Sequence, residues 1–238
     1  MHGISKTLLR IAFLTLLIVI PLQGKDDGVS VGFVSVALDA RIAELKYQNG
    51  AEVEELNVYK GARSKRIAYN GDQTVHFFRE SEQVDDNGDP IRTIVGSVHL
   101  PQKNGVFLFI FRRLPGADEK YKIVPIPDGL KQFRPGMYRF INLTPYDIAL
   151  KVGETKSLMK KGKFTDLESK ADSGSYQEAM MYSLVVEQGE VDMKPYRAFK
   201  GKVLFSENRR SIYIITPKDG GRAGRVDITV IPENLTKR

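Results

Sequence analysis

Asn104-Gly-Val-Phe-Leu-Phe-Ile-Phe111 joins a turn dipeptide to a run of β-branched and aromatic residues, the composition of a β-strand. Asn-Gly and Asp-Gly tolerate the positive φ angles of tight hairpin turns, and these dipeptides recur along the chain. Comparable strand-forming runs occupy 212–215 and 226–231. Only 175–187 carries a competing helix signal, a capping box that begins at Ser175. The sequence therefore predicts an all-β protein.

The second half of the chain repeats the first at an offset of 105 residues. Pro90-Ile-Arg-Thr-Ile-Val-Gly-Ser-Val98 aligns without gaps with Pro195-Tyr-Arg-Ala-Phe-Lys-Gly-Lys-Val203. Across 90–130 and 195–235, ten of 41 aligned positions are identical, against about two or three expected by chance. The strand alternation also stays in phase, whereas a slip of one residue would turn every side chain to the other face. An internal duplication explains both observations.

A repeat of this length has the size of an immunoglobulin-like β-sandwich, which takes about 100 residues. We therefore expect two tandem immunoglobulin-like β-sandwich domains related by internal duplication, the first at 25–130 and the second at 131–238. Solenoids and propellers are disfavoured, because their units are shorter and more numerous.

The first 24 residues have the layout of a secretory signal peptide. Lys6 and Arg10 precede an unbroken apolar run at 11–20, and Gly24 is a small residue before a polar segment. A membrane-spanning helix needs about 20 apolar residues, twice the length of this run. We expect a signal peptide at 1–24, cleavage after Gly24, and a protein that is periplasmic or extracellular. An uncleaved N-terminal anchor is the alternative.

Composition removes several classes of active site. The 238 residues carry a formal net charge of +7 and include no Cys and three His. Disulfides, thiolate metal sites, iron–sulfur clusters and cysteine nucleophiles are therefore excluded. Three imidazoles leave little for a histidine metal site or a Ser-His pair. We expect a protein that is not an enzyme and that has no cofactor and no metal site.

Two local motifs resemble reactive sites but lack their other parts. Ser157-Leu-Met-Lys160 matches the S-x-x-K of penicillin-binding enzymes, which also need S-D-N and K-T-G elements that this chain lacks. Asp85-Asp-Asn-Gly-Asp89 resembles a calcium loop, but with Gly88 in sixth place Gln83 and Ile94 fall where carboxylates are required. The patterns predict a strand and a hairpin turn instead, with no catalytic residue.

Positive charge gathers in the second half of the chain. Residues 25–130 carry 14 basic and 16 acidic side chains, whereas 131–238 carry 20 and 13. A solvated lysine-rich hairpin is one interpretation. The other is an anion-binding edge that faces a polyanion such as cell-wall polymer or lipopolysaccharide. Specific nucleic-acid binding is not expected, because no recognition module is visible. The candidate anion contacts are Lys151, Lys156, Lys161 and Lys163.

Resemblance to known families rests on a few stretches. Ile123-Val-Pro-Ile-Pro-Asp-Gly-Leu130, Gly136-Met-Tyr-Arg-Phe-Ile-Asn-Leu-Thr144 and Arg210-Ser-Ile-Tyr-Ile-Ile215 resemble a family of exported bacterial β-sandwich proteins without assigned function. Phe133-Arg-Pro135 followed by Asn142-Leu-Thr-Pro-Tyr146 is similar to the start of the second domain in periplasmic pilus chaperones, which are basic exported pairs of immunoglobulin-like domains. The first half has no matching pattern, so the chaperones' subunit-anchoring Arg and Lys cannot be placed.

These features favour an exported, non-enzymatic binding or structural protein of the cell envelope. Its partner would be another envelope protein or an anionic envelope polymer. Two alternatives stay open: a pilus-chaperone-like protein that donates a strand edge to a partner subunit, and a glycosidase whose paired carboxylates are scattered in sequence. An exposed edge beside a basic cleft would favour the chaperone, and close carboxylates in one cleft would favour the glycosidase.

Overall fold

The computed structural model describes residues 28–168, 172–186 and 193–235, which form sixteen β-strands. The expected signal peptide and its cleavage site lie outside these residues. In this part of the chain, no helix is long and apolar enough to cross a membrane. The all-β class predicted from strand alternation and turn dipeptides is confirmed.

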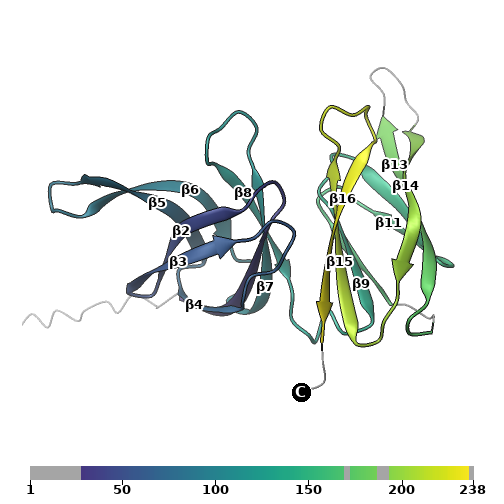
Figure 1. The fold of residues 1–238 in the computed structure, drawn as a ribbon, viewed down its shortest axis with the longest axis horizontal. Coiled ribbons are helices and arrows are strands. Elements are labelled where there is room, and N and C mark those ends of the chain that lie inside the picture. The colour runs from purple at the N-terminus through teal and green to yellow at the C-terminus, as the bar shows by residue number, and fades with distance from the viewer. Residues whose placement is uncertain (1–27, 169–171, 187–192, 236–238) are drawn as a thin grey trace, which may run out of the picture.

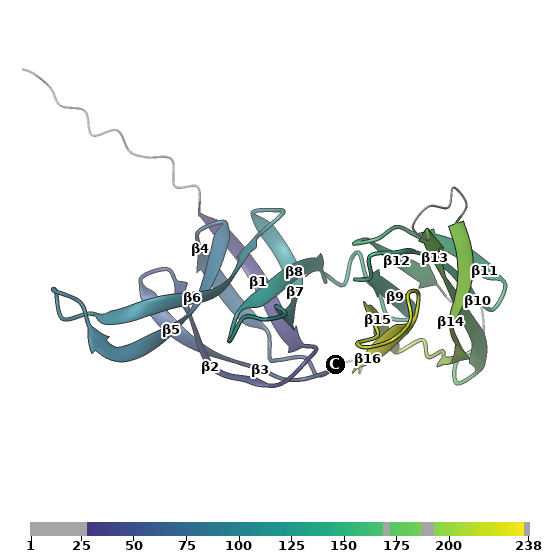
Figure 2. The ribbon, with the colours of Figure 1, turned by 90° about the horizontal axis from the view of Figure 1, so that it is seen from above.

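The strands of the first sandwich are β1 (Val29–Ala37), β2 (Ile42–Asn49), β3 (Glu52–Val58), β4 (Ile67–Gly71), β5 (Thr74–Val84), β6 (Pro90–His99), β7 (Asn104–Arg113) and β8 (Tyr121–Pro127). They form two four-stranded sheets, ordered β4-β1-β7-β8 and β3-β2-β5-β6 (Figure 1). The hairpin of β5 and β6 projects away from the second sandwich (Figures 1 and 2).

The strands of the second sandwich are β9 (Met137–Asn142), β10 (Asp147–Val152), β11 (Thr155–Met159), β12 (Phe164–Glu168), β13 (Tyr176–Val186), β14 (Met193–Leu204), β15 (Arg209–Pro217) and β16 (Val226–Asn234). Their sheets are ordered β12-β9-β15-β16 and β11-β10-β13-β14. The segment with the capping-box signal is strand β13, which is hydrogen-bonded on both sides to β10 and β14.

The second sandwich repeats the strand order of the first, with every strand number raised by eight. β9 runs parallel to β15 just as β1 runs parallel to β7. Phe33 stacks on Phe109 with ring centroids 4.7 Å apart, and Phe140 stacks on Tyr213 at the same distance. The two β-sandwiches predicted from the sequence repeat are therefore confirmed. The gapless offset of 105 is wrong at β7 and β15, because Phe109 lies in the first core whereas its aligned Ile214 faces the junction. The residue equivalent to Phe109 in the second core is Tyr213. Each has eight strands, one more than an immunoglobulin constant domain.

Each sandwich closes over its own apolar core, because alternate residues of a strand point to the same face. Phe107, Phe109 and Phe111 of β7 lie in the first core. Val98 and Val203, which the sequence repeat aligns, are both buried and each stands one residue before the end of its strand, β6 or β14. Full burial of such side chains stabilises the fold by about 1.5–3 kcal/mol each.

Candidate functional site

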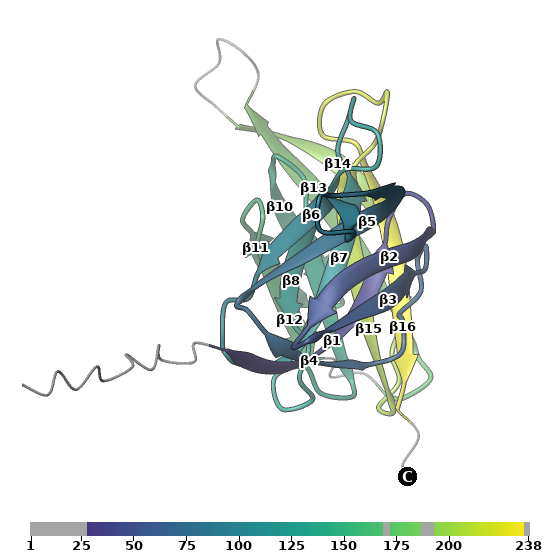
Figure 3. The ribbon, with the colours of Figure 1, turned by 90° about the vertical axis from the view of Figure 1, so that its left-hand side faces the viewer.

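A third apolar core joins the two sandwiches, between the β4-β1-β7-β8 sheet and the β12-β9-β15-β16 sheet. These sheets face each other in Figures 1 and 2, and Figure 3 shows the first sandwich in front of the second. Since the phenylalanines of β7 face inward, the alternate residues Leu108 and Ile110 face the second sandwich, and both are 0% exposed. The buried residues of this junction core are Val34, Val36, Leu108, Ile110, Ile126, Phe133, Ile141, Ile212, Ile214 and Ile231.

A buried carboxylate ties the connecting segment to both sandwiches. Asp128 directly follows β8 and is 0% exposed. It pairs with Arg63 of the first sandwich and with Arg210 of the second, where Arg210 Nη2 lies 3.3 Å from Asp128 Oδ2. Glu233 Oε2 completes the network, 3.4 Å from Arg63 Nη2 and 2.5 Å from Arg210 Nε. A buried charge is strongly destabilising when unpaired, so this network fixes the connecting segment in place.

A second buried arginine, Arg139 on β9, reinforces the junction. Its Nε and Nη2 donate to the two carboxylate oxygens of Asp166, each at 2.6 Å, and its Nη1 donates to the carbonyl of Pro127 at the end of β8. Its guanidinium lies over the rings of Phe133 and Phe164, at 4.4 and 4.6 Å from their centroids. Bidentate pairing and ring stacking together hold the guanidinium in one orientation.

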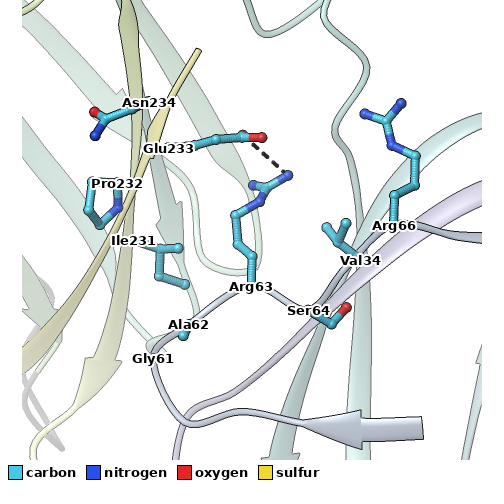
Figure 4. Close-up of a pocket in the computed structure, with 10 residues that line it drawn as sticks. All are labelled: Val34, Gly61, Ala62, Arg63, Ser64, Arg66, Ile231, Pro232, Glu233 and Asn234. Carbon is cyan, nitrogen blue, oxygen red and sulfur yellow. Dashed lines mark ion pairs between the residues drawn. The ribbon is translucent and has the colours of Figure 1, made fainter. Parts of the chain in front are cut away.

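One hollow at the junction, of about 670 Å³, opens beside this network (Figure 4). Arg63 points toward Glu233 across it, and the same arginine also holds Asp128. Arg63, the cation that points into this hollow, is therefore already paired with two carboxylates of the protein. We assign this hollow to the contacts that join the sandwiches.

A second hollow at the junction, of about 400 Å³, is lined by cations from both sandwiches. Arg112 of β7 and Lys122 of β8 come from the first, and Lys161 comes from the loop between β11 and β12. Val124 and Leu143 supply apolar walls. Among the residues that the structure describes, no carboxylate lines this hollow. A concave site with one sign of charge concentrates ions of the opposite sign.

The structure divides the four predicted anion contacts between the two ends of β11. Lys151 and Lys156 lie opposite each other in the β10–β11 register, and Lys151 Nζ is 3.6 Å from Glu154 Oε1. Lys161 lies past the other end of β11, at the second hollow, and the exposed Lys163 follows it in the same loop. The structure thus brings Lys151 and Lys156 together and places Lys161 elsewhere.

A single carboxylate anchors the loop that carries Lys161. Asp147 Oδ2 accepts a hydrogen bond from Lys160 Nζ at 2.8 Å, and Asp147 Oδ1 accepts one from the backbone N–H of Lys161 at 3.0 Å. These two bonds, with that of Lys160 the stronger influence, hold the pKa of Asp147 below its ordinary value.

Lys151 and Lys156 belong to a larger cationic surface on the outside of the second sandwich. Residues 150 and 152 are buried in the second core, so Lys151 points to the outer face of the β11-β10-β13-β14 sheet. Across this sheet Lys156 lies opposite Lys151, Lys151 opposite Met180, and Met180 opposite Lys200. We call this surface the basic face. Its cations are Lys151, Lys156, Arg197, Lys200 and Lys202.

The structure gives the glycosidase alternative little support. Glu154 and Glu168 line one hollow of about 250 Å³. Their side chains are 98% and 65% exposed, and they pair with Lys151 and Arg134. The general acid of a glycosidase needs enclosed surroundings that favour its protonated form, whereas these two side chains are solvated and paired with cations.

The other motifs take the structural places predicted for them. Ser157 lies in strand β11, with its hydroxyl 3.4 Å from that of Thr165. Asp85 Oδ1 accepts hydrogen bonds from the backbone N–H groups of Asp89 and Asn87, which closes the hairpin turn and lowers the pKa of Asp85. Among the described residues, no group of three or more His, Cys, Asp or Glu side chains could hold a metal ion.

Sequence reasoning missed the cations that other strands bring to these surfaces. Arg112 and Lys122 join Lys161 only because the sandwiches pack together, and Lys200 joins Lys151 only through strand pairing. One signal was present. The run 106–111 is apolar at every position, which is typical of a strand buried on both faces. That pattern points to a second apolar contact beyond the domain's own core.

No protein-family model matches the sequence, and no curated protein matches it. One solved structure that resembles the chain is the crystal structure of a protein from Bacteroides uniformis, provisionally named a cell adhesion protein. It has 10% sequence identity and a TM-score of 0.24, over 90% of this chain and 100% of that chain. A likeness at this TM-score says nothing about the function of the present chain.

Proposed function

We propose that this chain is an exported, non-enzymatic binding protein of the cell envelope, whose basic face contacts an anionic envelope polymer. The observation that carries the proposal is the strand register, which aligns Lys156, Lys151 and Lys200 in one row on the outside of a sheet. The five cations of the basic face exceed its two carboxylates, Glu154 and Glu178, by three.

The row supports a binding role because like charges stand close together in it, offset only by the solvated Glu154 beside Lys151. Lys151 and Lys156 are directly opposite on neighbouring strands, and like charges in that position repel each other. A polyanion relieves this repulsion and contacts several cations at once, with an affinity that salt screens. Leu158 and Tyr182, which are 51% and 36% exposed, lie in the next row of the same face and offer apolar contacts.

The junction supports a structural part of the proposed role. The junction core and the ion pairs of Asp128 hold the two sandwiches in one arrangement. A rigid body loses less conformational entropy when it binds than a flexible pair of domains does. The first sandwich then serves as a fixed spacer or as a second contact surface beside the basic face.

Strand donation to a partner subunit has weaker support. At the junction, β7 and β15 are each hydrogen-bonded to neighbouring strands on both sides. β8 is an edge strand, but β6 of the facing sheet approaches it so closely that a Cβ added at Gly96 would lie 3.1 Å from the carbonyl oxygen of Tyr121. The basic hollow of Arg112, Lys122 and Lys161 supplies one half of the chaperone pattern, and the other edges of the junction sheets are β4, β12 and β16. We favour the basic face because the edge beside that hollow, β8, is the one that β6 approaches.

The binding half of the proposal is tested by retention on heparin and on purified anionic cell-wall polymer. The double variant Lys156→Glu/Lys200→Glu should elute at markedly lower salt than the unchanged protein, because it reverses two charges of the row. The matched control Lys65→Glu/Lys218→Glu makes the same charge change at exposed positions away from the basic face. Equal elution of the two double variants would refute a specific role for the basic face.

The export half is tested by the N-terminus of the protein recovered from fractionated cells. Export with cleavage after Gly24 predicts a mature protein that starts at Lys25 and is found in the periplasm or the medium. Full-length protein confined to the cytoplasm would contradict the proposal.

A further inference from the structure

The second hollow at the junction has the size of a site for one small molecule. Its volume of about 400 Å³ lies within the range of ligand pockets, about 300–1,000 Å³. Arg112 and Lys122 come from the first sandwich and Lys161 from the second, and the apolar side chains of Val124 and Leu143 also line the hollow. The hollow thus combines three positive charges with an apolar wall.

The placement of two of these cations is unfavourable without an anion. Arg112 and Lys122 are directly opposite in the β7–β8 register, and like charges at such a position destabilise a sheet. Arg112 also continues the alternate positions of Leu108 and Ile110, so it points to the same side as the junction core. Lys161 adds a third positive charge from the other sandwich.

The three junction arginines with largely buried side chains show what this hollow lacks, whereas the exposed Arg66 of the first hollow has no carboxylate partner among the described residues. Arg63, Arg139 and Arg210 are each paired with a carboxylate of Asp or Glu. Within the described part of the chain, the side chains of Arg112 and Lys122 make no ion pair or hydrogen bond. Asp147, which is already bonded to Lys160, is the carboxylate that acts on Lys161. Arg112 and Lys122 have no such partner among the described residues, so their neutralising charge would come from a ligand.

The loop that brings Lys161 is held in place before any ligand arrives. The buried Asn142 side chain donates from Nδ2 to the carbonyl oxygens of Tyr146, at 2.8 Å, and Lys160, at 3.3 Å. Gly162 takes the left-handed backbone conformation that the turn needs, with φ of 70°. Asp147 fixes the loop from its other side. Such preorganisation reduces the entropy cost of binding.

We infer that this hollow is a binding site for a phosphate group carried on a small organic molecule. Three cations match the double negative charge of a phosphate monoester better than the single charge of a carboxylate, and the guanidinium of Arg112 suits a phosphate. Val124 and Leu143 would contact the carbon part of the ligand. The site is separate from the basic face, because Lys161 and Lys156 lie at opposite ends of β11.

The test is calorimetric titration of the purified protein with inorganic phosphate, phenyl phosphate and benzoate. Phenyl phosphate should bind most tightly, because it offers both charge and apolar surface, and benzoate should bind at least several-fold more weakly. Arg112→Gln and Lys122→Gln should each weaken phenyl phosphate binding about tenfold or more. The matched control Arg113→Gln, the next residue of the same strand, should bind as the unchanged protein does.

Thermal unfolding gives a second test, which distinguishes a lost binding site from a variant that binds weakly because its fold is damaged. Without anion, Arg112→Gln should unfold at the same or a higher temperature than the unchanged protein, since it removes like-charge repulsion. Phosphate should raise the unfolding temperature of the unchanged protein more than that of the variant. Absence of saturable binding, or equal binding by Arg112→Gln and Arg113→Gln, would overturn the inference. Polymer retention through Lys156 and Lys200 is measured separately, so either proposal can fail alone.

Discussion

At the scale of single residues, Asp128 is the group on which the junction depends most. Its carboxylate is fully buried and is shared by Arg63 and Arg210, whose side chains are 11% and 1% exposed. Removal of one partner of a buried ion pair leaves an uncompensated charge, which costs about 3–5 kcal/mol. We therefore expect Asp128→Asn to lower the free energy of unfolding by about 3 kcal/mol in urea denaturation. The exposed Asp118→Asn is the control, and an equal midpoint for both would contradict the expectation.

Asp147 gives the stability of the second sandwich an acid dependence. Hydrogen bonds from Lys160 Nζ and then from the Lys161 N–H lower its folded-state pKa. A carboxyl with a lowered folded pKa stabilises the fold above its unfolded pKa, near 3.8, and loses this contribution as pH falls through the folded value. Between pH 5 and strongly acidic pH, we expect the unchanged protein to lose more stability than Asp147→Asn, measured by denaturant unfolding. Parallel curves would show that the bonds contribute nothing to folding.

At the scale of elements, glycine decides how closely two sheets approach at one corner of the first sandwich. Gly96 of β6 faces β8, and a Cβ there would lie 2.9 Å from Ile123 Cδ1 and 3.1 Å from the backbone oxygen of Tyr121. The atoms nearest to a Cβ at the aligned Gly201 of β14 belong to the ring of Phe199, at the far end of a side chain that can move away as a whole, unlike a backbone carbonyl. We expect Gly96→Ala to destabilise by about 1–3 kcal/mol and Gly201→Ala by less.

The control for this pair is Gly129→Ala, where the nearest atom to an added Cβ lies 4.0 Å away. Urea unfolding of the three variants ranks them directly. If Gly201→Ala were the most destabilised, the backbone contact between β6 and β8 would not be the reason for glycine at position 96.

The sequence was sufficient to predict most of the strands but not their second contacts. Turn dipeptides and alternation are local signals, so they located runs such as 106–111 and 226–231 correctly. The repeat predicted that Val98 and Val203 would occupy matching positions, and both are buried one residue before the end of their strands. Its predicted phase is wrong by one residue between β7 and β15. Local signals do not report which outer face meets another domain. For that reason the junction core and its buried arginines were not foreseen.

At the scale of the whole molecule, the candidate phosphate site depends on residues that are distant in sequence. Arg112, Lys122 and Lys161 come from three segments in two sandwiches and meet only at the junction. Composition identified Lys161 as one of a group of lysines, but the group itself is split by β11. Charge counts can show that cations are abundant in one half of a chain. Only the packing of the two domains shows which cations share a hollow.

The junction core should make the two sandwiches unfold as one unit. Ile110 of the first sandwich and Ile214 of the second are both 0% exposed. Each side chain lies in the junction core and points toward the other sandwich. Truncation of a buried Ile to Ala lowers the free energy of unfolding by about 2–5 kcal/mol. At these two positions the lost stability is that of the contact between the sandwiches. The double variant Ile110→Ala/Ile214→Ala should therefore turn a single calorimetric transition into two, with the less stable sandwich unfolding first. The control Val84→Ala/Leu158→Ala alters side chains that are 57% and 51% exposed and should keep one transition. A single transition at unchanged temperature in the junction variant would mean that the sandwiches are coupled through the ion pairs of Asp128 rather than through apolar contact.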